Sequence, residues 1–373
     1  MSKAMNATLT YDHSLGMNYT RILDDLIVGS CLQKPTDVEH LEREGVTTVL
    51  QLQEDSDLEY FSLDNAPIRD RCAAGPIQHI RHAVRDFDPY SLRRRLPEAV
   101  ALIAQSAARP AAGTTYIHCT AGLGRAPATA LAWMWWFKGI PLDEAYAQLT
   151  SLRPCKPRAD SIREAAVDLL YGNDPIDVTI ALRRRDAGAS DVRIAGIDVG
   201  WGQSVPLVAF GTAKRPAPSD SHSATCFVLR VSLLRQVPQP TGGRGVMPPM
   251  HIVKRRWVLK LEPTCARSPS HSRYTPRVSS VRRLPPGLFQ FKFIWDGEWG
   301  ISMDHQSIVD GDNVNNSLLV PDADLGPAAA AARHRIRTGG DLTDDERARI
   351  CEMLLQMDVN PYSTSAPADL NPL

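Results

Sequence analysis

The residues in this sequence best placed to do chemistry are a cysteine and an arginine six positions apart. Cys119 ends an apolar run, the next five residues are small or Gly-rich apart from Leu123, and Arg125 opens an apolar helical segment. A loop of this length can turn its N–H groups toward one centre, where the dipole of the following helix helps to bind a phosphate dianion. The same field favours the thiolate of Cys119, which is the nucleophilic form.

The glycines and the arginine of this loop have separate roles. Gly122 and Gly124 permit the positive φ angles that a ring of N–H groups requires. Arg125 can hold two phosphate oxygens in a fork that lysine cannot copy. The complete string favours this chemistry over an ordinary buried cysteine in a strand-to-helix turn. The predicted phosphate-binding residues are Thr120, Ala121, Gly122, Leu123, Gly124 and Arg125.

A thiolate that attacks phosphorus also needs an acid to protonate the leaving oxygen. The best candidate stretch is 85–92, which follows an expected strand and precedes an expected helix. It contains two carboxylates, Asp86 and Asp88. The residue types alone leave both open, and either could be a surface carboxylate that flanks a helix.

Composition sets limits on the partners. The 373 residues suffice for two domains, and 42 basic residues balance 42 acidic ones, so nothing global indicates a nucleic-acid or membrane partner. No apolar run approaches the roughly 20 residues of a membrane span. The seven cysteines are scattered without CxxC spacing, which fits a reducing compartment and predicts no metal site. No cofactor is expected.

The pattern from Met17 to Gly172 positions the loop and the candidate acid. Strands alternate with helices, which predicts an α/β domain with a mostly parallel sheet at 17–172. The helix after the loop is apolar nearly all round, so it should be the buried central helix. Strands are expected at 26–29, 46–50, 77–84 and 115–118, and helices at 35–44, 96–107, 126–139, 141–153 and 158–171.

The rest of the chain has a different pattern. Short β-prone runs at 173–320 predict an all-β sandwich, with Pro-, Ser- and Arg-rich disordered insertions, or intron sequence read as exon, near 211–254 and 263–283. A linker is expected at 321–340, with Ala328 to Ala332 inside it. The capping box at 343–346 predicts a docking helix at 341–358, with Ile350, Leu354 and Met357 on one face. Residues 1–16 are expected to be a disordered tail.

The stretch 86–92 with 97–99 resembles the general-acid loop of dual-specificity phosphatases, which implies that Asp86 is the acid. Four further stretches, 18–20, 25–33, 57–61 and 124–127, resemble the plant and algal glucan phosphatases of that family. The resemblance covers nearly all of 17–172. It implies a cysteine-dependent phosphatase domain that removes phosphate from starch through a phosphocysteine.

Three positions depart from relatives in that family. Ala126 stands where most protein phosphatases place a serine or threonine that helps the thiolate leave, so the intermediate must rely on Asp86 as base toward water. Lys156 stands where some relatives have an aromatic residue, which bears on how the glucan is oriented. Gln51 stands where some have a second cysteine, which bears on redox control.

The resemblance also implies residues that contact glucan. Tyr60, Phe61 and Phe87 match an aromatic platform, although each read alone is more typical of a core residue. The β region resembles a family 48 carbohydrate-binding module over 196–203, 257–260, 284–299 and 315–316. That resemblance implies sugar stacking by Trp201 and Trp299, and hydrogen bonds to hydroxyls from Lys292 and Asn315. Without it, sandwich core would be the better reading of the tryptophans.

These observations predict a phosphoglucan phosphatase with Cys119, Arg125 and Asp86 as catalytic residues, starch or amylopectin as partner, and no metal. A monomer is expected. The substrate implies a plastid stroma, although the N-terminus shows no signal or transit peptide, so the protein is cytosolic or the sequence lacks its targeting segment. Two alternatives remain open: a dual-specificity phosphatase acting on phosphoprotein, and a non-catalytic starch-binding scaffold.

Overall fold

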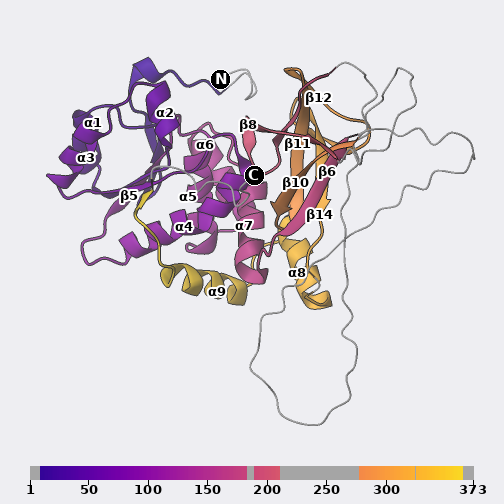
Figure 1. The fold of residues 1–373 in the computed structure, drawn as a ribbon. Helices are drawn as coiled ribbons and strands as arrows, with labels where there is room; N and C mark the ends of the chain where they lie inside the picture. Colours follow the sequence, from indigo (N-terminus) through magenta and orange to yellow (C-terminus); the bar gives the residue numbers. More distant parts are fainter. Residues whose placement is uncertain (1–8, 183–188, 211–276, 324, 364–373) are drawn as a thin grey trace, which may run out of the picture. The chain divides into compact units, whose positions relative to one another are not determined.

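The computed structural model describes residues 9–182, 189–210, 277–323 and 325–363 (Figure 1). The described residues group into two compact units. The first contains those of Met1–Asn173, Ile197–Gln203 and Asp324–Asp369, and the second contains the remainder. Among the described residues, no helix is long and apolar enough to cross a membrane.

A six-stranded sheet forms the centre of the first unit, in the order β1-β2-β5-β3-β4-β15. Its strands are β1 (Tyr19–Leu23), β2 (Leu26–Gly29), β3 (Val46–Gln51), β4 (Gln78–His82), β5 (Thr114–His118) and β15 (Tyr362–Ser363). Only the β1–β2 pair is antiparallel, so the expected mostly parallel sheet is confirmed. Because β5 lies between β2 and β3, the loop that follows it emerges from the middle of the sheet.

The helices of this unit largely match the expected ones. They are α1 (Pro35–Arg43), α2 (Asp55–Tyr60), α3 (Ala66–Ala73), α4 (Pro89–Ala107), α5 (Arg125–Trp136), α6 (Leu142–Leu152) and α7 (Ala159–Tyr171). Two differences matter for the site. Helix α4 starts at Pro89 instead of Leu96, because Asp88 caps it and proline suits a first turn. The short helix α2 was not predicted.

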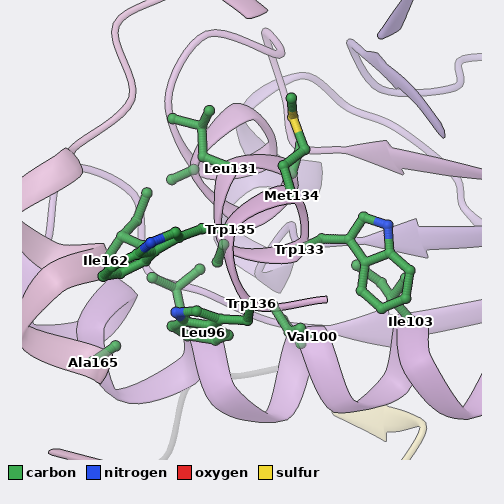
Figure 2. Packing of buried hydrophobic residues seen from close by; sticks show 14 of the residues in the cluster. Leu96, Val100, Ile103, Leu131, Trp133, Met134, Trp135, Trp136, Ile162 and Ala165 are labelled. Atoms are coloured by element: carbon green, nitrogen blue, oxygen red, sulfur yellow. The ribbon is translucent and has the colours of Figure 1, made fainter. Parts of the chain in front are cut away.

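Helix α5 is the buried central helix that the sequence predicted. All of its residues are buried, and Trp135 and Trp136 are 0% exposed. In Figure 2, Trp136 points toward Leu96 of α4 and Trp135 toward Ile162 of α7, all within one apolar cluster. This packing fixes the N-terminus of α5, and with it Arg125, beside the end of β5.

Two C-terminal helices complete the first unit. The expected linker contains α8 (Pro327–Arg337), which packs on α7 with Ile336 fully buried and Arg337 paired with Glu164 at 2.9 Å. The prediction of a linker across Ala328 to Ala332 is therefore wrong, because an alanine run has high helix propensity and needs only a few docking residues. Helix α9 (Asp344–Leu355) has the predicted capping box.

Helix α9 docks as expected, with Ile350 and Leu354 fully buried in the main core. We expect Leu354→Ala to lower the free energy of unfolding by about 2–5 kcal/mol, because it leaves a cavity where α9 meets that core. Urea unfolding at constant pH measures this. The adjacent Leu355 is 49% exposed, and Leu355→Ala should cost within about 0.5 kcal/mol. Equal losses in the two variants would contradict the docked arrangement.

The second unit is all β, as predicted. One sheet has the order β6-β10-β9 and the other β13-β14-β11-β7-β8, with β12 paired to β11. His305 joins their facing sides, since its ring contacts Phe291 and Phe293 while its Nε2 lies 2.9 Å from the carbonyl of Ala181. The strands of these two sheets are β6 (Ile176–Leu182), β7 (Val192–Gly196), β8 (Gly200–Pro206, of which Gly200–Gln203 group with the first unit), β9 (Val208–Phe210), β10 (Arg277–Leu284), β11 (Gly287–Trp295), β12 (Glu298–Gly300), β13 (Gln306–Asp310) and β14 (Asn313–Val320).

Three predicted disordered segments need comment. The first insertion, near 211–254, and the motif at 257–260 lie outside the described residues. The second prediction, near 263–283, is wrong for 277–283, which belong to β10 and pair with β6 along nearly its whole length. Backbone hydrogen bonds build this strand in spite of its arginine- and serine-rich composition. The prediction of a disordered tail is wrong for 11–15, where Tyr11 contacts Cys31 and His13 stacks on Phe61, while residues 1–8 lie outside the described residues.

Candidate active site

The predicted nucleophile lies where β5 gives way to α5. Cys119 is 3% exposed, and its Sγ accepts a hydrogen bond from the backbone N–H of Gly122 at 3.3 Å. Gly122 has the expected positive φ, 68°. Gly124 does not: as the N-cap of α5 it has a φ of −126°, so that expectation is wrong. One left-handed residue is enough to turn the loop back toward Cys119.

Arg125 enters the site from the first turn of α5 and is held by two carboxylates. Its Nη1 and Nη2 lie 2.6 and 3.1 Å from the two oxygens of Asp57, and its Nε lies 3.2 Å from Oδ1 of Asp86. Burial alone would lower the pKa of Arg125, but the charges of Asp86 and Asp57 raise it. The guanidinium therefore stays charged although it is only 4% exposed.

The two candidate acids have different surroundings. Asp88 caps α4, accepting from the N–H groups of Tyr90 and Ser91 at 2.9 Å each, and its side chain is 1% exposed. The Asp86 side chain is 35% exposed and lies beside Arg125. One carboxylate is thus occupied by helix capping, and the other faces the guanidinium and is open to solvent. This geometry favours Asp86 as the acid.

Residues that sequence reasoning missed lie around the loop. Gln53 donates to Oγ1 of Thr120 at 3.1 Å, Gln51 donates to Gln53 at 3.1 Å, and Asn65 donates to Gln51 at 2.9 Å. Gln51 is therefore part of a buried amide chain that ends on the phosphate-binding loop. One signal in the sequence could have indicated these residues: Gln51 and Gln53 stand on either side of Leu52 at the end of β3. Polar residues at the carboxyl end of a central strand tend to face a binding site.

The aromatic residues of the predicted platform are partly exposed. Tyr60 ends α2 and is 67% exposed, and Phe87 is 37% exposed beside Asp86, with a positive φ of 53°. Both observations disfavour a core role for these two rings. Phe61 is half-buried, stacked on His13 at 4.5 Å and edge-on to Tyr60 at 4.8 Å.

Three predicted sugar contacts in the second unit share one sheet face. Residues 290, 292 and 294 alternate onto the same face of β11, and Trp299 lies opposite Ile294. Asn315 reaches this face from β14, where its amide donates to Gln290 at 2.7 Å. Trp299 is 52% exposed, whereas Asn315 is buried. Trp201 lies on β8, beside β7 in the same sheet, and groups with the first unit.

Two buried histidines, His82 and His118, are the last residues of β4 and β5. Burial lowers the pKa of His82 and of His118 to about 3. Both histidines stay neutral in the folded protein, whereas in the unfolded chain they titrate near pH 6.5. Between about pH 3 and pH 6.5 the unfolded chain therefore binds more protons than the folded protein. We expect the free energy of unfolding to fall as the pH drops below 6.5, by up to about 1.4 kcal/mol per pH unit for each histidine.

Urea unfolding of the first unit between pH 7.5 and 5 measures this dependence. His82→Gln should remove one titrating group and flatten the curve. An unchanged slope in that variant would show that His82 is not buried in its neutral form.

Among the described residues, no cluster of three or more histidine, cysteine, aspartate or glutamate side chains could hold a metal ion. The five cysteines in this part of the chain are free thiols.

No family model matches the chain. Phosphoglucan phosphatase DSP4, amyloplastic, from Castanea sativa is 37% identical over 360 residues, 95% of this chain and 78% of the relative. Phosphoglucan phosphatase LSF1, chloroplastic, from Arabidopsis thaliana is 33% identical over 162 residues, 43% of this chain and 27% of the relative. The solved structure of the Cydia pomonella PTP-2 phosphatase aligns at 20% identity and a TM-score of 0.33, covering 43% of this chain and 91% of that chain. Given the extent of the first match, the chain belongs to the phosphoglucan phosphatase family of dual-specificity phosphatases.

Proposed function

We propose that the protein hydrolyses phosphate monoesters on the glucosyl units of starch through a phosphocysteine intermediate. The observation that carries this proposal is the meeting of Cys119 and Arg125, from the loop between β5 and α5, with Asp86, from the segment between β4 and α4, at the carboxyl end of the parallel strands. Each supplies a part that the reaction needs: a nucleophile, a fixed cation for the phosphoryl oxygens, and a proton donor.

The reaction proceeds in two displacements. The thiolate of Cys119 forms a bond to phosphorus while the bond from phosphorus to the sugar oxygen breaks, and Asp86 gives its proton to that oxygen. Asp86, now a carboxylate, takes a proton from a water molecule that attacks the phosphocysteine, which restores the thiolate and releases phosphate. Arg125 and the loop N–H groups hold the phosphoryl group in both steps. Since Ala126 offers no hydroxyl to the departing thiolate, the second step depends on Asp86.

The glucan preference rests on two sets of residues. Tyr60, Phe61 and Phe87 supply aromatic surface on the phosphatase unit, and the sheet face with Lys292 and Trp299 supplies a second sugar contact. We assign the second surface to a carbohydrate-binding module within 173–320 and propose that the protein acts as a monomer. The two phosphoglucan phosphatases to which it is similar are named amyloplastic and chloroplastic, which supports a plastid location here.

A comparison of two substrates tests the proposal. The purified chain should release phosphate from amylopectin faster than from a phosphotyrosine or phosphothreonine peptide of equal phosphate content. If the peptide is dephosphorylated faster and amylopectin releases no phosphate, the alternative of a dual-specificity phosphatase acting on phosphoprotein is favoured instead. Binding of amylopectin without any phosphate release would favour the scaffold.

Trp299 provides a test of the module. We expect Trp299→Ala to weaken amylopectin binding about tenfold, because a stacked aromatic ring supplies roughly 1 kcal/mol or more beyond its buried area. Cosedimentation with insoluble starch measures the binding. Val309 is 70% exposed on the opposite face of the same sheet, so Val309→Ala is the matched control. Hydrolysis of a small soluble phosphate ester should be unchanged in both, and equal starch binding by the two variants would contradict the assignment.

A further inference from the structure

Every backbone carbonyl from Cys119 to Gly124 has a partner outside the ring of the loop. Those of Thr120, Leu123 and Gly124 accept from the backbone N–H groups of Cys31, Lys156 and Ala128 at 2.9 to 3.0 Å. That of Cys119 lies 3.1 Å from Nδ1 of His118. The two at the centre of the loop, on Ala121 and Gly122, are held by one side chain, Arg153.

Holding these carbonyls fixes the N–H groups. In a planar trans peptide the C=O and the following N–H point in opposite directions. When Arg153 Nη2 binds the carbonyl of Ala121 at 3.3 Å, the N–H of Gly122 must point away from Arg153, and it donates to the Sγ of Cys119 at 3.3 Å. Likewise, Arg153 Nε on the carbonyl of Gly122 at 2.9 Å turns the N–H of Leu123 away from the guanidinium.

Arg153 is itself firmly anchored. It caps the C-terminus of α6, is 5% exposed, and its Nη2 donates to Oδ1 of Asn18 at 2.7 Å, with Thr20 Oγ1 at 3.5 Å from Nη1. These are neutral oxygens. The charge of Arg125 is opposed by two carboxylates, whereas the positive charge of Arg153 lies directly behind the loop, where it also favours an anion.

We propose that Arg153 is a positioning residue, which orients the N–H groups of Gly122 and Leu123 toward the thiolate and the bound phosphoryl group. This inference rests on the proposed phosphate-binding role of the loop. It also explains the need for glycine at 122, because a Cβ there would collide with Nη2 of Arg153 and with the carbonyl oxygen of Gly29.

The test compares Arg153→Lys with the wild-type enzyme. Lysine keeps the charge but cannot fork to two carbonyls. We expect the inhibition constant of inorganic phosphate to rise about tenfold, and kcat/KM for p-nitrophenyl phosphate to fall roughly tenfold to a hundredfold, as for loss of one or two hydrogen bonds from a charged group. Asn18→Ala keeps Arg153 but removes its amide anchor, and should shift both constants in the same direction by less.

Arg163→Lys is the matched control. Arg163 is 7% exposed and also donates to two carbonyls, those of Ile336 and Gly340, in a part of the unit that does not touch the loop. Its substitution should lower the urea midpoint and leave the phosphate inhibition constant unchanged. The inference is overturned if Arg153→Lys changes the inhibition constant no more than Arg163→Lys does. A wild-type protein that binds no phosphate would overturn the proposed function as well, so the two failures are distinguishable.

Discussion

Replacement of Cys119 by serine is expected to abolish phosphate release, with a loss of about 10⁴-fold or more in kcat. Oxygen replaces sulfur in nearly the same position, so the loop and Arg125 keep their places. A serine hydroxyl is much less acidic than a thiol and is a poor nucleophile without a base. Phosphate release from amylopectin and from p-nitrophenyl phosphate measures the effect.

Cys72→Ser is the control for a general effect of removing a thiol. Burial raises the pKa of Cys72 to about 11, so this thiol is protonated at neutral pH, and the variant should keep its turnover. Cys119→Ser should also keep amylopectin binding, since the proposed aromatic contacts are untouched. Turnover retained by Cys119→Ser would refute the nucleophile assignment.

Asp86→Asn is expected to reduce kcat on amylopectin about 10²- to 10⁴-fold, the usual contribution of a general acid or base. The loss should be much smaller in the first displacement on p-nitrophenyl phosphate, whose leaving group departs without a proton. A burst of nitrophenolate followed by slow turnover is therefore expected. The second displacement stays slow because the variant has no carboxylate at position 86 to take a proton from the attacking water. Rapid-mixing absorbance measurements separate the two steps.

Asp88→Ala distinguishes the two neighbouring carboxylates. It should cost about 0.5–2 kcal/mol of stability, because the cap of α4 is lost. Asp86→Asn should leave the urea midpoint nearly unchanged, since that side chain is 35% exposed. If Asp88→Ala produced the burst and Asp86→Asn did not, the roles assigned to the two residues would be reversed.

The parts of the site that sequence predicted are those set by neighbours in the chain. The strand, loop and helix around Cys119 follow from local apolar pattern and glycine spacing, so their bounds were nearly correct. The carboxylate partner of Arg125 was not predicted, since Asp57 lies 68 residues earlier and on a helix too short for a periodic signal. Arg153 was missed for the same reason. In the sequence Arg153 is recognisable only as the end of a helix, and its contact with the loop arises from the tertiary fold.

The choice between Asp86 and Asp88 shows what the fold adds. Both have the same side chain and nearly the same place in the sequence. The residue at which α4 starts determines which carboxylate caps the helix. The prediction had this helix start at Leu96, several residues after its actual start at Pro89. In the second unit, the shared face of Lys292 and Trp299 depends on strand register, which residue types alone do not determine.

The ion pair between Asp57 and Arg125 links the position of α2 to that of the guanidinium. Asp57 contacts the guanidinium, and Tyr60, an exposed ring, follows three residues later on the same helix, about 4.5 Å further along its axis. The contact with the guanidinium and the exposed ring are therefore separated by less than one helical turn. Insertion of one residue between Asp57 and Tyr60 would therefore rotate the ring by about 100° and move it about 1.5 Å further from Asp57 along the helix axis.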